Sequence, residues 1–201
     1  RDEMFDDFGK VRAIYSDFGK FLSEAKLDSL NQMKEFSNQF FKNQGVTFTV
    51  YHDNKGVERI FPFDIIPRII NFNEWEIIEK GIIQRITALN LFLKDVYHEK
   101  FIIKDEVIPA SLLINNDCYL RQMMRLEVPK NIYTHISGVD LIRDKNGELF
   151  VLEDNLRTPS GVSYMLENRE ITRRLYPNLM PIHKVQPVDN YPQILYQQLK
   201  T

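Results

Sequence analysis

The stretch that decides the fold runs from residue 139 to residue 169 and reads VDLIRDKNGELFVLEDNLRTPSGVSYMLENR. Its pattern predicts a strand, a tight turn, a second strand, an ordered loop and a helix from about residue 163. Asn146-Gly147 marks the turn, because both central positions of a type I′ hairpin turn need a positive φ, which these residue types adopt readily. We therefore expect a β-hairpin followed by a helix.

The length of this turn decides which side chains meet. If Asn146 and Gly147 form a two-residue loop, counting back along both strands places Asp140 directly opposite Glu153. Directly opposed residues share a face, with Cβ atoms roughly 4.5–5.5 Å apart, and Asn155 follows Glu153 by two residues onto the same face. Two carboxylates that close repel each other unless a cation or a proton lies between them. Two acids and an amide oxygen are suitable ligands for Mg²⁺.

Another register would remove this site. A three-residue loop with a glycine bulge within residues 144–147 places Asp140 on the face of Asp154 and away from Glu153. Acidic residues at strand ends are also commonly solvated and without function. The surroundings favour a site nonetheless, because residues 149–152 are apolar on both faces, as in a strand that is covered on both sides.

The residues after the second strand suit an anion. Arg157, Thr158 and Ser160 lie between this strand and the predicted helix. Backbone N–H groups at a helix N-terminus, together with an arginine, bind phosphate or carboxylate groups well.

A second group of charges lies in the proline-containing segment at residues 59–70, which we interpret as an extended, largely buried connector. Its charged residues include Arg59, Asp64 and Arg68. Buried charges need partners, so these side chains either pair internally or meet an anionic ligand. In the second case Arg68 is a candidate phosphate contact.

The composition is that of an ordinary soluble globular protein, with 43% hydrophobic and 27% charged residues among 201. A net charge of −2 without a lysine- or arginine-rich block gives no reason to expect nucleic acid. The single Cys118 excludes a disulfide framework and a cysteine-based zinc site, and indicates a reducing compartment. No apolar run reaches the roughly 18 residues of a membrane span. We expect a cytoplasmic protein whose 201 residues form a single domain or lobe.

Periodic apolar residues predict the remaining elements. Helices are expected at 4–25, 28–43, 73–96, 163–175 and 190–200, and strands at 46–51, 57–61 and 132–142. Asn73 is the expected N-cap of the third helix, with Glu76 completing a capping box, and Trp75 is assigned to the core. The fold class is therefore α+β, a mostly antiparallel sheet with flanking helices.

Several runs closely resemble the circularly permuted ATP-grasp type 2 family, which is related to glutathionylspermidine synthase. With Phe5, they are GVTFTVY at 45–51, ERIFPFD at 58–64, IPR at 66–68, HISGVD at 135–140 and LEDNLRTPSGVSY at 152–164. The last run is the most specific. The resemblance implies part of a permuted ATP-grasp fold and an ATP-dependent carboxylate–amine ligase, which forms an amide or peptide bond through an acyl phosphate.

The resemblance also implies roles for individual residues. The magnesium ligands that hold the ion against ATP would be Asp140, Glu153 and Asn155. Arg157 would be the catalytic residue that stabilises the acyl phosphate. The substrate or phosphate contacts would include Thr158 and Ser160.

Members of this family are about twice as long as this chain. In them the metal-binding half comes first, and the half with the nucleotide-clamping lysines follows. We therefore expect this chain to be the metal-binding half, inactive alone. Its expected partners are ATP, a small-molecule or peptide carboxylate, an amine and the missing C-terminal half of the same polypeptide, with no nucleic acid and no membrane.

Two other functions fit some of these features. The same hairpin could be a non-catalytic scaffold module that binds a divalent cation or a small anion. A glycosidase would also use two carboxylates, but those stand about 5–9.5 Å apart across an open cleft lined by aromatic side chains. Here the two acids are expected side by side, and Trp75 is assigned to the core.

Overall fold

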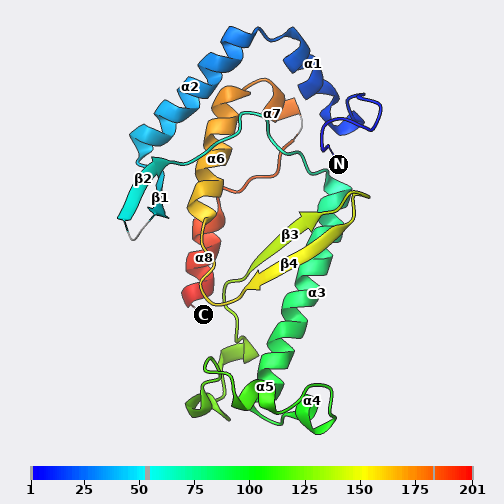
Figure 1. The fold of residues 1–201 in the computed structure, drawn as a ribbon, viewed down its shortest axis with the longest axis vertical. Coiled ribbons are helices and arrows are strands. Elements are labelled where there is room, and N and C mark those ends of the chain that lie inside the picture. Colours follow the sequence, from blue (N-terminus) through cyan, green and yellow to red (C-terminus); the bar gives the residue numbers. More distant parts are fainter. Residues whose placement is uncertain (1, 53–54, 183, 201) are drawn as a thin grey trace. The chain divides into compact units, whose positions relative to one another are not determined.

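The computed structural model describes residues 2–52, 55–182 and 184–200, with side chains outside 48–58 and 182. The chain forms two compact units: the first unit comprises Arg1–Ile70 and Ser160–Thr201, and the second unit comprises Asn71–Pro159. Each unit contains helices and one two-stranded antiparallel hairpin (Figure 1). The α+β class is therefore confirmed, but the described residues form two separate two-stranded hairpins where one mostly antiparallel sheet was expected. The single domain or lobe expected from the sequence stays a prediction.

The first unit is mainly helical. Its elements are a 3₁₀ helix (Ala13–Tyr15), α1 (Ser16–Glu24), α2 (Leu27–Gln44), β1 (Thr47–His52), β2 (Lys55–Ile60), α6 (Val162–Leu175), α7 (Leu179–Ile182) and α8 (Tyr191–Lys200). Helix α2 ends where the sequence predicts, because Gly45 adopts the left-handed conformation with φ 67° and closes the last turn.

The helix expected from residue 4 is wrong in its first half. Residues before Ala13 form a turn instead, with an isolated bridge between Phe5 and Val11. The Asp6 carboxylate accepts hydrogen bonds from the N–H groups of Phe8 (3.0 Å) and Lys10 (2.8 Å). Such local bonds compete with helical ones, which is why aspartate disfavours helix interiors.

The core of the first unit lies where α2 packs against α6. Phe41 of α2 and Ile171 of α6 are fully buried, and Phe63 of the connector joins the same cluster. A second cluster is formed by Met4, Tyr15, Phe18 and Tyr176. The Tyr176 hydroxyl donates to the Ile65 carbonyl oxygen at 2.6 Å, and burial raises the pKa of this tyrosine to about 12.

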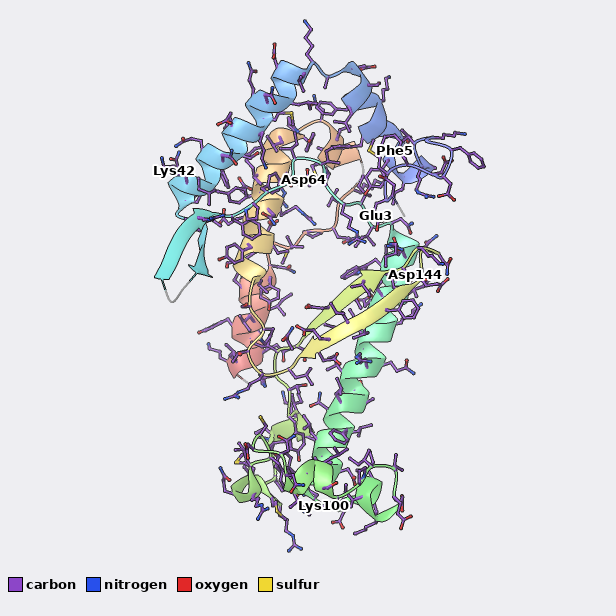
Figure 2. The ribbon with its side chains drawn as sticks, in the orientation of Figure 1. Glu3, Phe5, Lys42, Asp64, Lys100 and Asp144 are labelled. Carbon is purple, nitrogen blue, oxygen red and sulfur yellow. The ribbon has the colours of Figure 1, made fainter. Side chains whose placement is uncertain are left out.

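The connector expected at 59–70 begins only at residue 61, because Arg59 and Ile60 belong to β2. Residues 61–70 form neither helix nor strand, and the charges of Asp64 and Arg68 have internal partners. The Arg68 guanidinium donates to a Glu3 carboxylate oxygen at 2.5 Å. The Asp64 carboxylate accepts from the Ile66 N–H at 2.9 Å. Both side chains are exposed, so the sequence overestimated the burial of this segment. Figure 2 labels Glu3 and Asp64.

The second unit is built on one long helix. Its elements are α3 (Phe72–Tyr97), α4 (Phe101–Lys104), α5 (Ser111–Ile114), 3₁₀ helices at Arg121–Met123 and Pro129–Asn131, β3 (Gly138–Arg143) and β4 (Leu149–Asn155). The β3–β4 hairpin lies along α3, while α4 and α5 gather at the C-terminal end of this helix (Figure 1). Figure 2 shows Asp144 at the hairpin turn, by the start of α3.

The strand expected at 132–142 begins only at Gly138. Before it, the Asn90 side chain of α3 accepts hydrogen bonds from the N–H groups of Tyr133 (2.7 Å) and Thr134 (3.1 Å). The Asn90 amide also donates to the Thr134 hydroxyl at 2.9 Å. These bonds attach the segment to the helix, so its N–H groups are not available to a strand ladder.

Trp75 is 46% exposed, so its assignment to the core is wrong. In the first turn of α3, Glu74 is directed toward the hairpin, because its carboxylate pairs with Arg143 of β3. Successive helical residues are about 100° apart around the axis, so Trp75 lies to the side of the Glu74 direction and remains partly exposed.

The N-cap of α3 is Asn71 rather than Asn73, because the Asn71 side chain accepts a hydrogen bond from the Glu74 N–H at 2.9 Å. We expect Asn71→Ala to lower the free energy of unfolding by about 1 kcal/mol. Asn73→Ala is the matched control and should be neutral or slightly stabilising, because alanine is the better helix former inside the first turn. Urea denaturation measures both variants, and a larger loss for Asn73→Ala would contradict this cap assignment.

Candidate functional site

The turn of the β3–β4 hairpin differs from the two-residue loop expected. The Asp144 N–H donates to the Glu148 carbonyl at 2.9 Å, and the Gly147 N–H donates to the Asp144 carbonyl at 3.1 Å. Three residues therefore lie between Asp144 and Glu148. The Asp144 carboxylate selects this loop, since it accepts from the N–H groups of Asn146 (2.9 Å) and Glu148 (2.8 Å). Gly147 takes a φ of 93°, as the left-handed position after such a turn requires.

A second irregularity restores the pairing that the sequence predicts. From the turn, Arg143 lies opposite Leu149 and Leu141 lies opposite Val151. The ladder then shifts by one residue, and Asp140 lies opposite Glu153. Such a shift is a β-bulge, in which two residues of one strand face one residue of the other. The three-residue loop shifts the register by one residue, and the bulge shifts it back. The predicted pairing of Asp140 with Glu153 is therefore confirmed, although the sequence predicted neither irregularity.

Asp140, Glu153 and Asn155 form the candidate metal site. All three are exposed, and the Asn155 amide nitrogen donates to a Glu153 carboxylate oxygen at 2.9 Å. Among the described residues, no lysine or arginine forms a salt bridge with either acid. The residues therefore fit a hard divalent cation: two carboxylates share a face without a basic partner, and the Asn155 amide oxygen remains as a third ligand. Among the described residues, no group of three histidine, cysteine or acidic side chains could hold a metal ion, and this candidate site has two acids and an amide.

Gly138 contributes to this site in a way that the sequence analysis missed. It lies opposite Asn155, and a Cβ at this position would be 3.0 Å from the Pro159 Cβ and 3.6 Å from the Asn155 Cβ. The absence of a side chain therefore lets the segment after β4 lie close against the start of β3. A glycine inside the strand predicted at 132–142 is the available sequence signal for such a close approach.

The remaining predicted residues are divided between the two units. Arg157 and Thr158 belong to the second unit and are exposed in the segment after β4. Ser160 and Arg68 belong to the first unit, and Arg68 pairs with Glu3. Their roles toward substrate or phosphate stay predictions.

The opposite face of the hairpin is attached to α3 by an ion pair. The Arg85 guanidinium donates to the two Asp154 carboxylate oxygens, from Nε at 2.8 Å and from Nη2 at 2.5 Å. This bond holds the pKa of Asp154 below its ordinary value. Glu153 and Asp154 thus have separate roles: one faces the candidate site, and the other positions the strand.

The Asp154–Arg85 pair predicts a dependence of stability on pH. Because the pKa of Asp154 is lowered in the folded state, its stabilisation is complete above the unfolded pKa, about 3.9, and is lost as the pH falls through the lower folded value. Asp154→Asn should therefore lower the melting temperature at pH 7, and the difference from the unmutated chain should shrink toward pH 3. Thermal unfolding across this range measures it, and a difference that does not change with pH would contradict the role of the pair.

A groove of about 680 Å³ separates α3 from the hairpin on the Asp154 side, lined mainly by apolar residues such as Ile78, Leu89 and Leu141. It lies behind the candidate site, not at it. The face that carries the acids also presents Ile142, Phe150 and Leu152, which are 46%, 52% and 63% exposed. The expectation that β4 is covered on both sides is therefore wrong for the described residues.

Comparisons with known proteins give matches that include residues of both units. A family model described as circularly permuted ATP-grasp type 2 matches residues 67–201. An uncharacterized protein of Synechocystis sp. is 43% identical over 98% of this chain, and one of Mycobacterium leprae is 41% identical over 99%. A Frankia alni protein named "Putative glutamate–cysteine ligase 2-3" is 34% identical over 98% of this chain.

This chain spans only 41%, 35% and 23% of the lengths of these three relatives, respectively. In the described part of the chain, no helix is long and apolar enough to cross a membrane.

Proposed function

Because the chain belongs to the circularly permuted ATP-grasp type 2 family, we propose that it is the metal-binding portion of an ATP-dependent carboxylate–amine ligase. The observation that carries this proposal is the pairing of Asp140 with Glu153, with Asn155 on the same face. The ligase name of the Frankia alni relative supports the same class of reaction.

In the proposed reaction, a carboxylate oxygen of the substrate attacks the γ-phosphorus of ATP, and ADP leaves. The amine nitrogen then attacks the acyl carbon, phosphate leaves, and the nitrogen loses a proton to give the amide. Asp140, Glu153 and Asn155 would hold Mg²⁺, which when bound supplies positive charge to the phosphate oxygens. Arg157 would donate hydrogen bonds to the acyl phosphate, because a guanidinium matches the geometry of phosphate oxygens.

The proposal includes a protein partner besides the substrates: the rest of a longer polypeptide of which this chain would be one part. The chain covers less than half of each relative named above, and the hairpin face with Ile142, Phe150 and Leu152 is exposed. Large exposed apolar patches are typical of interaction surfaces. We place the nucleotide-clamping residues in that remainder, and the substrates are a small-molecule or peptide carboxylate and an amine.

Release of ADP by the complete protein tests this proposal. We expect release that requires Mg²⁺ together with a carboxylate and an amine acceptor, measured by coupled ADP detection over a panel of amino acids and short peptides. Chelation by EDTA should abolish the signal and added Mg²⁺ should restore it. Binding of Mg²⁺ without any ADP release across the panel would instead support the non-catalytic scaffold module.

A further inference from the structure

A second polar site lies in the first unit, between α6 and the segment that follows it. Arg169 and Arg173 are four residues apart on α6, so their side chains are neighbours on one face of the helix. Together with Pro177, Met180, Pro181 and Val185 they line a pocket of about 410 Å³. The candidate metal site and its segment contribute none of these residues.

The two arginines differ in how their charge is balanced. Arg173 donates to both Asp189 carboxylate oxygens, from Nη1 at 3.1 Å and from Nη2 at 2.7 Å. Arg169 donates to the Gln186 backbone carbonyl at 2.5 Å, and no described carboxylate lies within salt-bridge distance of it. A guanidinium has five N–H donors and no acceptor, so most of the Arg169 donors have no partner among the described residues.

Arg169 is also in an unfavourable position for an unbalanced charge. Its side chain is only partly exposed, and burial together with the charge of Arg173 lowers its pKa from the ordinary value, although Asp189 opposes this effect. Like charges four residues apart on a helix destabilise it. An anion that binds Arg169 would offset both the burial of its charge and the repulsion from Arg173.

We propose that this pocket binds a small aliphatic carboxylate, with the carboxylate on Arg169 and the hydrocarbon part against Pro177, Met180 and Val185. The planar guanidinium fork matches a carboxylate with two parallel hydrogen bonds. The other walls are apolar and suit methylene groups rather than further polar atoms. The volume is within the range of small-molecule sites. This site is independent of the proposed ligase reaction.

The test is a titration of the complete protein, labelled with ¹⁵N-arginine, with acetate, butyrate, hexanoate and inorganic phosphate. In the unmutated protein we expect hexanoate to shift the Nε–H signal of Arg169, which is identified by its loss in Arg169→Lys. Affinity should rise by up to about fourfold for each added methylene. Phosphate should bind more weakly than hexanoate, because it makes no use of the apolar walls.

Two substitutions complete the experiment. Arg169→Gln should weaken hexanoate binding by about 10- to 100-fold, because charge-assisted hydrogen bonds are lost. Arg174→Gln is the matched control on the same helix, since Arg174 pairs with Glu170 at 2.8 Å, and it should leave the affinity unchanged. An unshifted Arg169 signal in the unmutated protein would overturn the proposal even if Arg169→Gln did not fold. Equal binding of phosphate and hexanoate, or equal effects of the two substitutions, would also overturn it.

Discussion

Replacing Glu153 with glutamine is expected to lower ATP turnover by the complete protein on the order of 100- to 1000-fold. A metal ligand contributes several kcal/mol of transition-state stabilisation, and each 1.36 kcal/mol corresponds to a factor of ten in rate. The substitution keeps the size of the side chain and removes the negative charge that makes a carboxylate a strong ligand for Mg²⁺. Because Glu153 is exposed and forms no salt bridge with a described lysine or arginine, stability should hardly change.

Glu148→Gln is the matched control for this prediction. It makes the same chemical change in the same hairpin, at an exposed residue beside the turn. Its turnover should equal that of the unmutated protein. Asp140→Asn should resemble Glu153→Gln, and the double variant should be little worse than either single one, because both acids act on one ion. Near-normal turnover of Glu153→Gln would refute its role as a ligand.

Replacing Phe41 with alanine is expected to lower the free energy of unfolding by about 3–5 kcal/mol, the range for a buried phenylalanine. Phe41 is fully buried, and its ring centroid lies 5.4 Å from that of Phe63 and 5.6 Å from that of Phe40. The cavity would open between α2 and α6, where the core of the first unit lies. Since domains are stable by only about 5–15 kcal/mol, this loss is a large fraction of the total.

Phe36→Ala on the same helix is the control for Phe41→Ala. Phe36 is 48% exposed, so its loss should cost much less. Urea denaturation of both variants, monitored by circular dichroism, gives the two free energies. Equal losses for Phe36→Ala and Phe41→Ala would contradict the core described for the first unit.

Elements with strong local signals could be predicted from the sequence. Helix α2 ends at Gln44, before the C-cap Gly45, and α6 begins at Val162, each within a residue of the expected position. A left-handed glycine and a clear apolar period depend on neighbouring residues only. These helix ends require no knowledge of distant contacts. The pairing of Asp140 with Glu153 was also predicted correctly, but through a two-residue turn that the structure does not contain.

The features that the sequence did not reveal depend on side chains that are distant in sequence or compete locally. The bulge beside Asp140 compensates for a turn that the Asp144 carboxylate selects, and neither effect follows from hydrophobic periodicity. The late start of β3 depends on Asn90, which is more than forty residues away in sequence from Tyr133, from whose N–H group it accepts a hydrogen bond. The exposure of Trp75 depends on which side of α3 the hairpin covers.

The position of the metal ion tests the central claim most directly. Crystals of the complete protein with Mn²⁺ and a non-hydrolysable ATP analogue would show the metal through its anomalous scattering, with Mn²⁺ in place of Mg²⁺. We predict a peak between the Asp140 and Glu153 carboxylates, within about 2.0–2.3 Å of their oxygens, and bridging to the phosphates. A bound nucleotide whose metal contacts neither acid would contradict the claim.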